Sequence, residues 1–154
     1  MAQAMWLSLG LAWPTLAMVA LVFAVWLTMV VTRMRHMRRH PPGPETFASG
    51  DAARRYFQPV AMPGDNLGNL FEMPVLFFAL VPLIVLFAVP SRTQIALAWI
   101  FVACRAAHSV IHIGPKRVMP RFMAYLASCI VLAAMWIGFA VDLARIARAL
   151  AAFG

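Results

Sequence analysis

The stretch that decides the fold is residues 5–32, which read MWLSLGLAWPTLAMVALVFAVWLTMVVT and contain no charged side chain. A helix that crosses a bilayer needs about 20 mostly apolar residues, so this stretch is long enough. Pro14 lies near its start, and packed membrane helices tolerate proline. The stretch does not fit a cleavable signal peptide, because it lacks a charged leading region and its cations begin only at Arg33. It therefore predicts a first membrane-spanning helix with the N-terminus outside.

The overall composition indicates the same class of protein. Of the 154 residues, 64% are hydrophobic and 12% are charged, and the mean hydropathy is +0.83. Soluble globular chains carry about 25% charged and about 45–50% apolar residues. These values exclude a disordered chain, a collagen, a coiled coil and a small disulfide scaffold. The length fits a single domain over residues 1–154, which we expect to be a polytopic all-α membrane protein.

Three further apolar runs are long enough to span a bilayer, at about residues 66–89, 93–113 and 120–141. Together with the first run, they predict four transmembrane helices per protomer, packed as a left-handed bundle. Residues 33–65 form the one long loop of this arrangement. An amphipathic stretch around residues 51–57 of that loop is expected on the membrane surface.

The charge distribution predicts the orientation. The formal net charge is +8, from 13 Lys and Arg against 5 Asp and Glu. The cations flank or interrupt the apolar runs, which disfavours nucleic-acid binding and favours contacts with anionic lipids. Nine cations lie between the first and second spans or between the third and fourth, and three lie on the other side. Cytoplasmic loops carry the excess of Lys and Arg, so both termini are predicted outside. The nine cations are Arg33, Arg35, Arg38, Arg39, Arg54, Arg55, Lys116, Arg117 and Arg121.

Polar side chains inside the spans carry the functional signal, because such groups are costly in a bilayer. Consecutive spans run in opposite directions, so the start of the second, the end of the third and the start of the fourth share one membrane depth. Within the third span, Arg105, His108 and His112 follow the i, i+3, i+7 pattern and lie on one helix face. The spacing of three residues also puts Asn69 and Glu72 on one face of the second span. The groups expected to converge on one cavity are Asn69, Glu72, Arg105, His108, His112, Arg121 and Tyr125.

Plainer interpretations stay open for the start of the second span and for Arg121. Either Asp65 or Asn66 is a good N-cap for the second span, which makes a structural role sufficient for that turn. Arg121 follows Pro120 at the start of a span, and this position also fits an interfacial cation whose charged end reaches the headgroups.

Two pairs of side chains also have alternatives. Glu72 and Arg105 fit a purely structural ion pair between helices. The i, i+4 spacing of His108 and His112 is that of metal ligands, but no HExxH motif or further histidine group accompanies them. We therefore expect no metal site.

The polar motifs resemble those of a known membrane family. The stretches concerned are residues 69–74, Asn-Leu-Phe-Glu-Met-Pro, and residues 105–112, Arg-Ala-Ala-His-Ser-Val-Ile-His, followed by Arg121 and Tyr125. In them, and in its length and four spans, the chain resembles the MAPEG family, the membrane-associated proteins of eicosanoid and glutathione metabolism. The resemblance implies a homotrimer of four-helix protomers that binds glutathione at subunit interfaces open to the cytoplasmic side. Together with the preference for Arg over Lys and the Ala content, it indicates a bacterial inner membrane.

The resemblance also implies roles for the first part of the polar set. Arg33, at the end of the first span, resembles an arginine that lines the family's site. Asn69 and Glu72 resemble the pair that holds the γ-glutamyl end of glutathione. Arg105 and His108 match the polar pair of the third span.

The remaining roles fall near the fourth span. His112 stands where the prostaglandin synthase branch of the family has a tyrosine. Arg117 and Arg121 match the basic residues that follow, and Arg121 resembles the one that stabilises the glutathione thiolate. Tyr125 matches the family's tyrosine one turn later.

Two positions depart from the family's pattern. Gly68 replaces an arginine that many eukaryotic members use on glutathione, and Phe122 replaces a serine of the prostaglandin branch. The first departure keeps another small thiol open as the cosubstrate.

The sequence thus predicts a glutathione-dependent transferase or peroxidase that acts on lipophilic electrophiles dissolved in the bilayer, with Arg121 and Arg33 as catalytic residues. A thiol is a weak nucleophile until a nearby cation lowers its pKa. Two other classes stay open. One is a non-catalytic membrane protein that binds a ligand or partner in the same cavity, and the other is a metal or haem site on His108 and His112.

Overall fold

The computed structural model describes residues 2–115 and 117–152, and the regular elements in this part of the chain are all helical. Lys116, one of the nine cations counted above, lies outside the described residues. Four helical segments are long and apolar enough to cross a membrane, which confirms the all-α transmembrane fold class. The elements are α1 (Ala2–Arg39), the 3₁₀ helix η1 (Pro44–Phe47), α2 (Gly50–Phe57), the 3₁₀ helix η2 (Gln58–Val60), α3 (Met62–Leu70), α4 (Met73–Leu86), α5 (Arg92–Ile113) and α6 (Val118–Ala151).

The helices extend beyond the apolar runs that predicted them. α1 continues through the basic residues and ends at Arg39, just before Pro41 and Pro42, which disfavour helical backbone in the residues before them. α3 begins at Met62, so the connecting segment is residues 40–61, shorter than the predicted loop 33–65. Most of this segment is in η1, α2 and η2, and α2 includes the stretch expected to be amphipathic.

The start of α3 also corrects an expected cap. Ala61 is the N-cap of α3, and Pro63 stands in its first turn, a position that proline favours. Asp65 and Asn66 therefore lie inside the helix, and the prediction that one of them caps it is wrong. Asn66 is fully buried, and neither of its side-chain amide atoms has a hydrogen-bond partner among the described residues.

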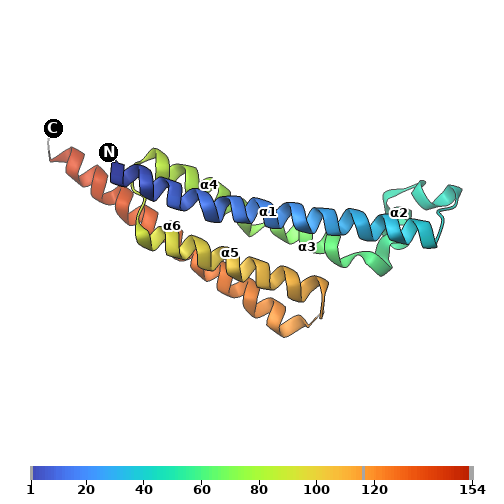
Figure 1. Ribbon diagram of the computed structural model, residues 1–154. Coiled ribbons are helices and arrows are strands. Elements are labelled where there is room, and N and C mark those ends of the chain that lie inside the picture. The colour runs from blue at the N-terminus through green and yellow to red at the C-terminus, as the bar shows by residue number, and fades with distance from the viewer. Residues whose placement is uncertain (1, 116, 153–154) are drawn as a thin grey trace.

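The helices form an elongated antiparallel bundle (Figure 1). α3 and α4 follow one another along α1, and α5 and α6 form a long hairpin beside them. The first turn of α1 and the last turn of α6 lie at one end, whereas α2, the end of α5 and the start of α6 lie towards the other. With 38 residues, α1 is about 57 Å long, almost twice the roughly 30 Å hydrocarbon core of a bilayer. Its ends must therefore extend into the headgroup regions or beyond.

The interior is apolar and closely packed at mid-depth. Phe77 of α4 stacks on Phe101 of α5, with ring centroids 4.8 Å apart and ring planes inclined by 17°. Met18 of α1 and Leu132 of α6 are buried beside them in the same core. Large apolar side chains are also abundant on the outer surface, as expected of a protein whose solvent there is lipid.

A break divides the second span into two helices. α3 ends at Leu70, α4 begins at Met73, and Glu72 has the non-helical backbone angles φ −90° and ψ −103°. Pro74 explains the break, because it has no N–H to donate to the carbonyl of Leu70 and its ring would collide with that carbonyl in a continuous helix. The break exposes Phe71 and Glu72 on the surface of the bundle.

α5 and α6 approach closely at the end of the bundle that carries the termini. Ser91 caps α5 by accepting a hydrogen bond from the Gln94 backbone N–H at 3.1 Å. The buried Gln94 side chain donates to the backbone oxygen of Met135 on α6 at 3.0 Å. A Cβ on Gly138 would lie 2.9 Å from Nε2 of Gln94, so a larger residue at position 138 would require the Gln94 amide to shift.

The turn after α4 contains a strained residue. Ala88 has φ 54°, in the left-handed region that favours glycine. Its N–H donates to the oxygen of Val85 at 3.1 Å, and the N–H of Val89 donates to the oxygen of Ile84 at 3.0 Å. These two bonds form a Schellman motif that ends α4 and starts the short connection to α5.

We predict that Ala88→Gly stabilises the protein. An L-residue in the left-handed region costs roughly 1–2 kcal/mol, so glycine removes this strain. The greater conformational freedom of glycine in the unfolded chain offsets part of the stabilisation. The expected net gain is about 0.5–1 kcal/mol, seen as a higher thermal unfolding midpoint in detergent. Ala79→Gly, on the exposed side of α4, is the control and should lower the midpoint. Equal decreases in both variants would contradict the strain argument.

We also predict that Pro74→Ala joins α3 to α4. Restoring the N–H at position 74 lets it donate to the carbonyl of Leu70, so the helix can continue and the backbone amides of Glu72 and Met73 gain helical acceptors. Hydrogen exchange measured by mass spectrometry should slow at the amides of residues 72 and 73, which both proteins contain. Pro82→Ala, the other proline inside α4, should leave exchange at 72–73 unchanged. Unaltered exchange at 72–73 in Pro74→Ala would show that another constraint holds the break.

Candidate functional site

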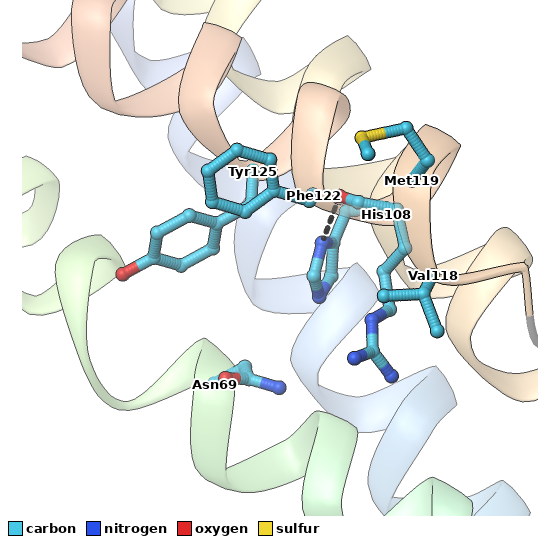
Figure 2. Close-up of a pocket in the computed structure, with 7 residues that line it drawn as sticks. Asn69, His108, Val118, Met119, Phe122 and Tyr125 are labelled. Atoms are coloured by element: carbon cyan, nitrogen blue, oxygen red, sulfur yellow. Dashed lines mark hydrogen bonds between the residues drawn. The ribbon is translucent and has the colours of Figure 1, made fainter.

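The candidate site is a cavity of about 400 Å³ where α3, α5 and the first turns of α6 meet (Figure 2). Its volume falls in the range of small-molecule sites, roughly 300–1,000 Å³. The residues that line it are Asn69, His108, Val118, Met119, Arg121, Phe122 and Tyr125.

The lining has two chemically different parts. Val118, Met119 and Phe122 of α6 are apolar and well exposed, with 68% of the Val118 surface and 53% of the Phe122 surface accessible. The rest is polar and comes from three helices, and Figure 2 shows Tyr125 reaching from α6 towards the segment that carries Asn69. The cavity can therefore accept a ligand with one apolar and one polar part.

Arg105 contacts the other two helices that form the site. It is fully buried, and its Nη2 donates to the backbone oxygen of Asn69 at 2.6 Å. In a continuous helix that oxygen would accept from the N–H of Met73, so the guanidinium replaces a donor that the break between α3 and α4 removes. The guanidinium carbon also lies 5.5 Å from the centre of the Tyr125 ring, in cation–π contact. Arg105 thus links α3, α5 and α6.

A chain of polar contacts crosses the cavity floor. Asn69 Nδ2 lies 3.4 Å from Nδ1 of His112, which lies 3.5 Å from Nε2 of His108. His108 Nδ1 lies 3.1 Å from the backbone oxygen of Arg121, the bond drawn in Figure 2. A carbonyl oxygen only accepts, so Nδ1 of His108 carries the hydrogen in this bond. The bond fixes the first turn of α6, and with it Arg121, against α5.

The structure therefore brings together six of the nine residues predicted for the site. The convergence expected from shared membrane depth is present at the ends of the spans. The six are Asn69, Arg105, His108, His112, Arg121 and Tyr125.

Glu72 does not line the cavity of this chain. The prediction that it shares a helix face with Asn69 assumed a continuous helix, and the break at residues 71–72 turns it to the exposed surface. It is near enough to Arg105 and Tyr125 to interact with them electrostatically. However, the ion pairs within 4.0 Å among the described residues are Arg54–Asp51 and Arg145–Asp142. The alternative of a direct structural pair between Glu72 and Arg105 is therefore not supported.

Arg33 and Arg117 also lie apart from the cavity. Arg33 packs on the ring of Phe57, with 4.9 Å from its guanidinium carbon to the ring centre, and lines a separate cavity of about 280 Å³ with Asp65. Arg117 is exposed and is the N-cap of α6, where its backbone oxygen accepts from the Arg121 N–H at 3.3 Å. Neither side chain reaches the polar cluster within one protomer.

The apolar wall is the part that sequence reasoning missed. Val118 and Met119 were not singled out, and Phe122 was noted only as a departure from a family pattern. A signal was present, because residues 118, 121, 122 and 125 follow helical spacing and share one face of α6. The pattern could not be recognised because most side chains of this span are apolar.

The histidine pair has no further metal-binding partners in this part of the chain. Among residues 2–115 and 117–152, no group of three or more His, Cys, Asp or Glu side chains is close enough to hold a metal ion. His108 and His112 interact with each other, with Asn69 and with the α6 backbone instead.

One of three comparisons with known proteins agrees with this architecture. A model of the MAPEG family matches residues 11–141, which contain all six residues of the polar cluster. Comparison with curated proteins found no match, and neither did comparison with solved structures. Because the match covers most of the chain, the protein belongs to the MAPEG family.

Proposed function

We propose that the protein is an integral membrane enzyme that uses the thiol of glutathione on lipophilic substrates, as a transferase or a peroxidase. Membership of the MAPEG family supports a membrane glutathione-transferase-like or related function in general. The observation that carries the specific proposal is the two-part cavity, in which Arg121 and a polar cluster face an apolar wall at the surface of a membrane-crossing helix.

Arg121 has the role of stabilising the thiolate. A guanidinium does not deprotonate in proteins, so it favours a nearby sulfur anion without acting as a base. In the transferase reaction the thiol proton leaves to water, the sulfur lone pair forms a bond to the electrophilic carbon, and the leaving group departs with its bonding electrons. In the peroxidase reaction two glutathione molecules become a disulfide, while the hydroperoxide becomes an alcohol and water.

The apolar wall has the role of holding the second substrate. Val118, Met119 and Phe122 belong to a segment that is long and apolar enough to cross the bilayer, and their side chains are exposed. A lipophilic electrophile dissolved in the membrane can reach such a wall without entering water. The wall then places the electrophile next to the sulfur, and holding the two reactants in this orientation lowers the barrier to reaction.

The proposal includes a homotrimer. Glu72 and Phe71 are exposed within the segment Met62–Leu86, and 62% of the Phe71 surface is accessible. An exposed carboxylate in a membrane segment is costly unless another protein surface or water covers it. A neighbouring protomer on this face would cover Glu72 and complete the site at the subunit boundary. The neighbouring protomer would also have to bring Arg33 and Arg117, which lie outside the cavity of one chain, to the ligand.

The distribution of cations between the two ends of the bundle determines its proposed orientation in the membrane. Arg35, Arg38 and Arg39 end α1, and Arg117 lies in the turn before α6, towards the same end of the bundle in Figure 1. By the positive-inside rule this end faces the cytoplasm, and both termini face outwards. A bacterial inner membrane fits this arrangement, and the cavity then lies near the cytoplasmic side, where glutathione is supplied.

Arg121→Ala is predicted to slow turnover far more than it weakens binding. The loss of one electrostatic group that acts where charge develops typically costs roughly 10²–10³ in rate. Calorimetric titration should still detect glutathione, whereas ultraviolet difference spectra should lose the thiolate band and an aryl halide should react slowly. Arg121→Lys should recover only part of the rate, because an ammonium lacks the planar fork.

Arg148→Ala is the matched control, since Arg148 is an exposed arginine on the same helix at the opposite end. It should retain both the thiolate signal and the rate. A normal rate in Arg121→Ala would leave Arg121 as an interfacial anchor. Glutathione binding by the unaltered protein without turnover of any electrophile would favour the non-catalytic alternative.

Glu72→Gln is predicted to weaken glutathione binding. A carboxylate that faces the ammonium of the peptide makes a charge-assisted hydrogen bond, and its loss costs about 1.5–3 kcal/mol in a shielded site. Calorimetric titration measures the loss, and light scattering in mild detergent checks that the trimer persists. Unchanged affinity together with a lower unfolding midpoint would show that Glu72 is structural.

A further inference from the structure

A further polar groove lies at the C-terminal end of α1, and it shares no lining residue with the cavity of Asn69 and Arg121 or with that of Arg33. Its volume is about 280 Å³, and it is formed by the last turns of α1 together with the end of η2. The residues that line it are Thr32, Arg35, His36, Arg39, His40 and Val60.

The groove presents hydrogen-bond donors and no carboxylate. Arg35 and Arg39 are four residues apart on α1, and His36 and His40 repeat the same spacing one position later, so the two pairs lie side by side. No ion pair involves Arg35 or Arg39 within the part of the chain that the structure describes. Two adjacent guanidinium groups without a counter-charge favour an anion.

An aromatic cluster holds the rim of the groove in place. The His36 ring lies 4.9 Å from the ring of Tyr56 in an edge-on arrangement, and also 4.9 Å from the ring of His40. The Tyr56 hydroxyl donates to the backbone oxygen of His40, which ties α2 to the residue after α1. These contacts hold the His36 ring and the backbone of His40 in place before any ligand arrives.

The depth of the groove matches that of lipid headgroups. Thr32 ends the uncharged stretch, and with a rise of about 1.5 Å per residue Arg35 and Arg39 lie roughly 4–10 Å beyond it. Phe47, which packs 6.0 Å from the Tyr56 ring, keeps 54% of its surface accessible. An exposed aromatic side chain next to a basic groove is typical of a surface that lies on the membrane interface.

We propose that this groove binds the phosphate group of an anionic phospholipid from the leaflet that surrounds the C-terminal end of α1. The two guanidinium groups supply the paired N–H donors that match phosphate oxygens, and the histidine rings supply further N–H donors. The acyl chains then run down the apolar surface of α1. This assignment is independent of the glutathione site, because none of its residues lines that cavity.

The test uses the full-length protein, reconstituted with equal amounts of phosphatidylglycerol and phosphatidylethanolamine and analysed by native mass spectrometry. The unaltered protein should retain phosphatidylglycerol in preference to phosphatidylethanolamine. Arg35→Gln/Arg39→Gln should reduce this retention about thirty-fold, the effect of two cations near a membrane surface. Arg92→Gln/Arg148→Gln removes the same charge from exposed arginines at the opposite end and should leave retention unchanged. Equal losses in the two double variants would overturn the proposal.

Two further arms complete the test. Inorganic phosphate at millimolar concentration should not displace the lipid, and displacement would assign the groove to free phosphate instead. Arg35→Lys/Arg39→Lys keeps the charge and serves if the glutamine variant does not fold. Its retention should fall several-fold because an ammonium lacks the paired donors, and full retention would overturn recognition by this groove.

Discussion

The hydrogen bond from Arg105 to the backbone oxygen of Asn69 is the contact on which the site depends. Pro74 prevents a continuous helix, and a broken helix inside a membrane leaves backbone groups that water cannot reach. A buried guanidinium satisfies the carbonyl of Asn69 and at the same time ties α3 to α5. Because the carbonyl is held in this way, the Asn69 side chain lies against His112 and the polar chain can continue across α5 to α6.

The rest of the molecule surrounds this polar region with apolar surface. Phe77 and Phe101 fill the interior, and large apolar side chains cover the outside of the bundle. In such a setting the desolvated polar cluster and the lipid-accessible wall of Val118, Met119 and Phe122 meet at one depth. A soluble enzyme must bring a lipophilic substrate out of the membrane. Under the proposed function, this arrangement would let the substrate stay there while its reactive end meets polar groups.

Composition and periodicity predict much of this structure. The four spans follow from apolar length, and the meeting of Asn69, Arg105, His108, Arg121 and Tyr125 follows from antiparallel spans that share one depth. The same reasoning placed Glu72 wrongly, because a spacing of three residues implies a shared face only while the helix is continuous. Whether Pro74 kinks the helix or ends it depends on which neighbours satisfy the carbonyls that lose their helical donors. For the carbonyl of Asn69 that neighbour is Arg105, 36 residues away in the sequence. The apolar wall was missed for a different reason, since its residues do not differ in type from those that face lipid.

The attachment of α6 to α5 has a consequence for how such a protein can diversify. Two side chains of α5, His108 and Gln94, donate to backbone oxygens of α6, those of Arg121 and Met135, which are about 21 Å apart along the helix. Every residue has a backbone oxygen, so these two anchors do not depend on the side chains of Arg121 and Met135. Mutations at Val118, Met119 and Phe122 can therefore reshape the wall while the position of the helix is conserved. Under the proposed function, single substitutions in this wall would change which electrophiles are accepted without changing the geometry of the scaffold.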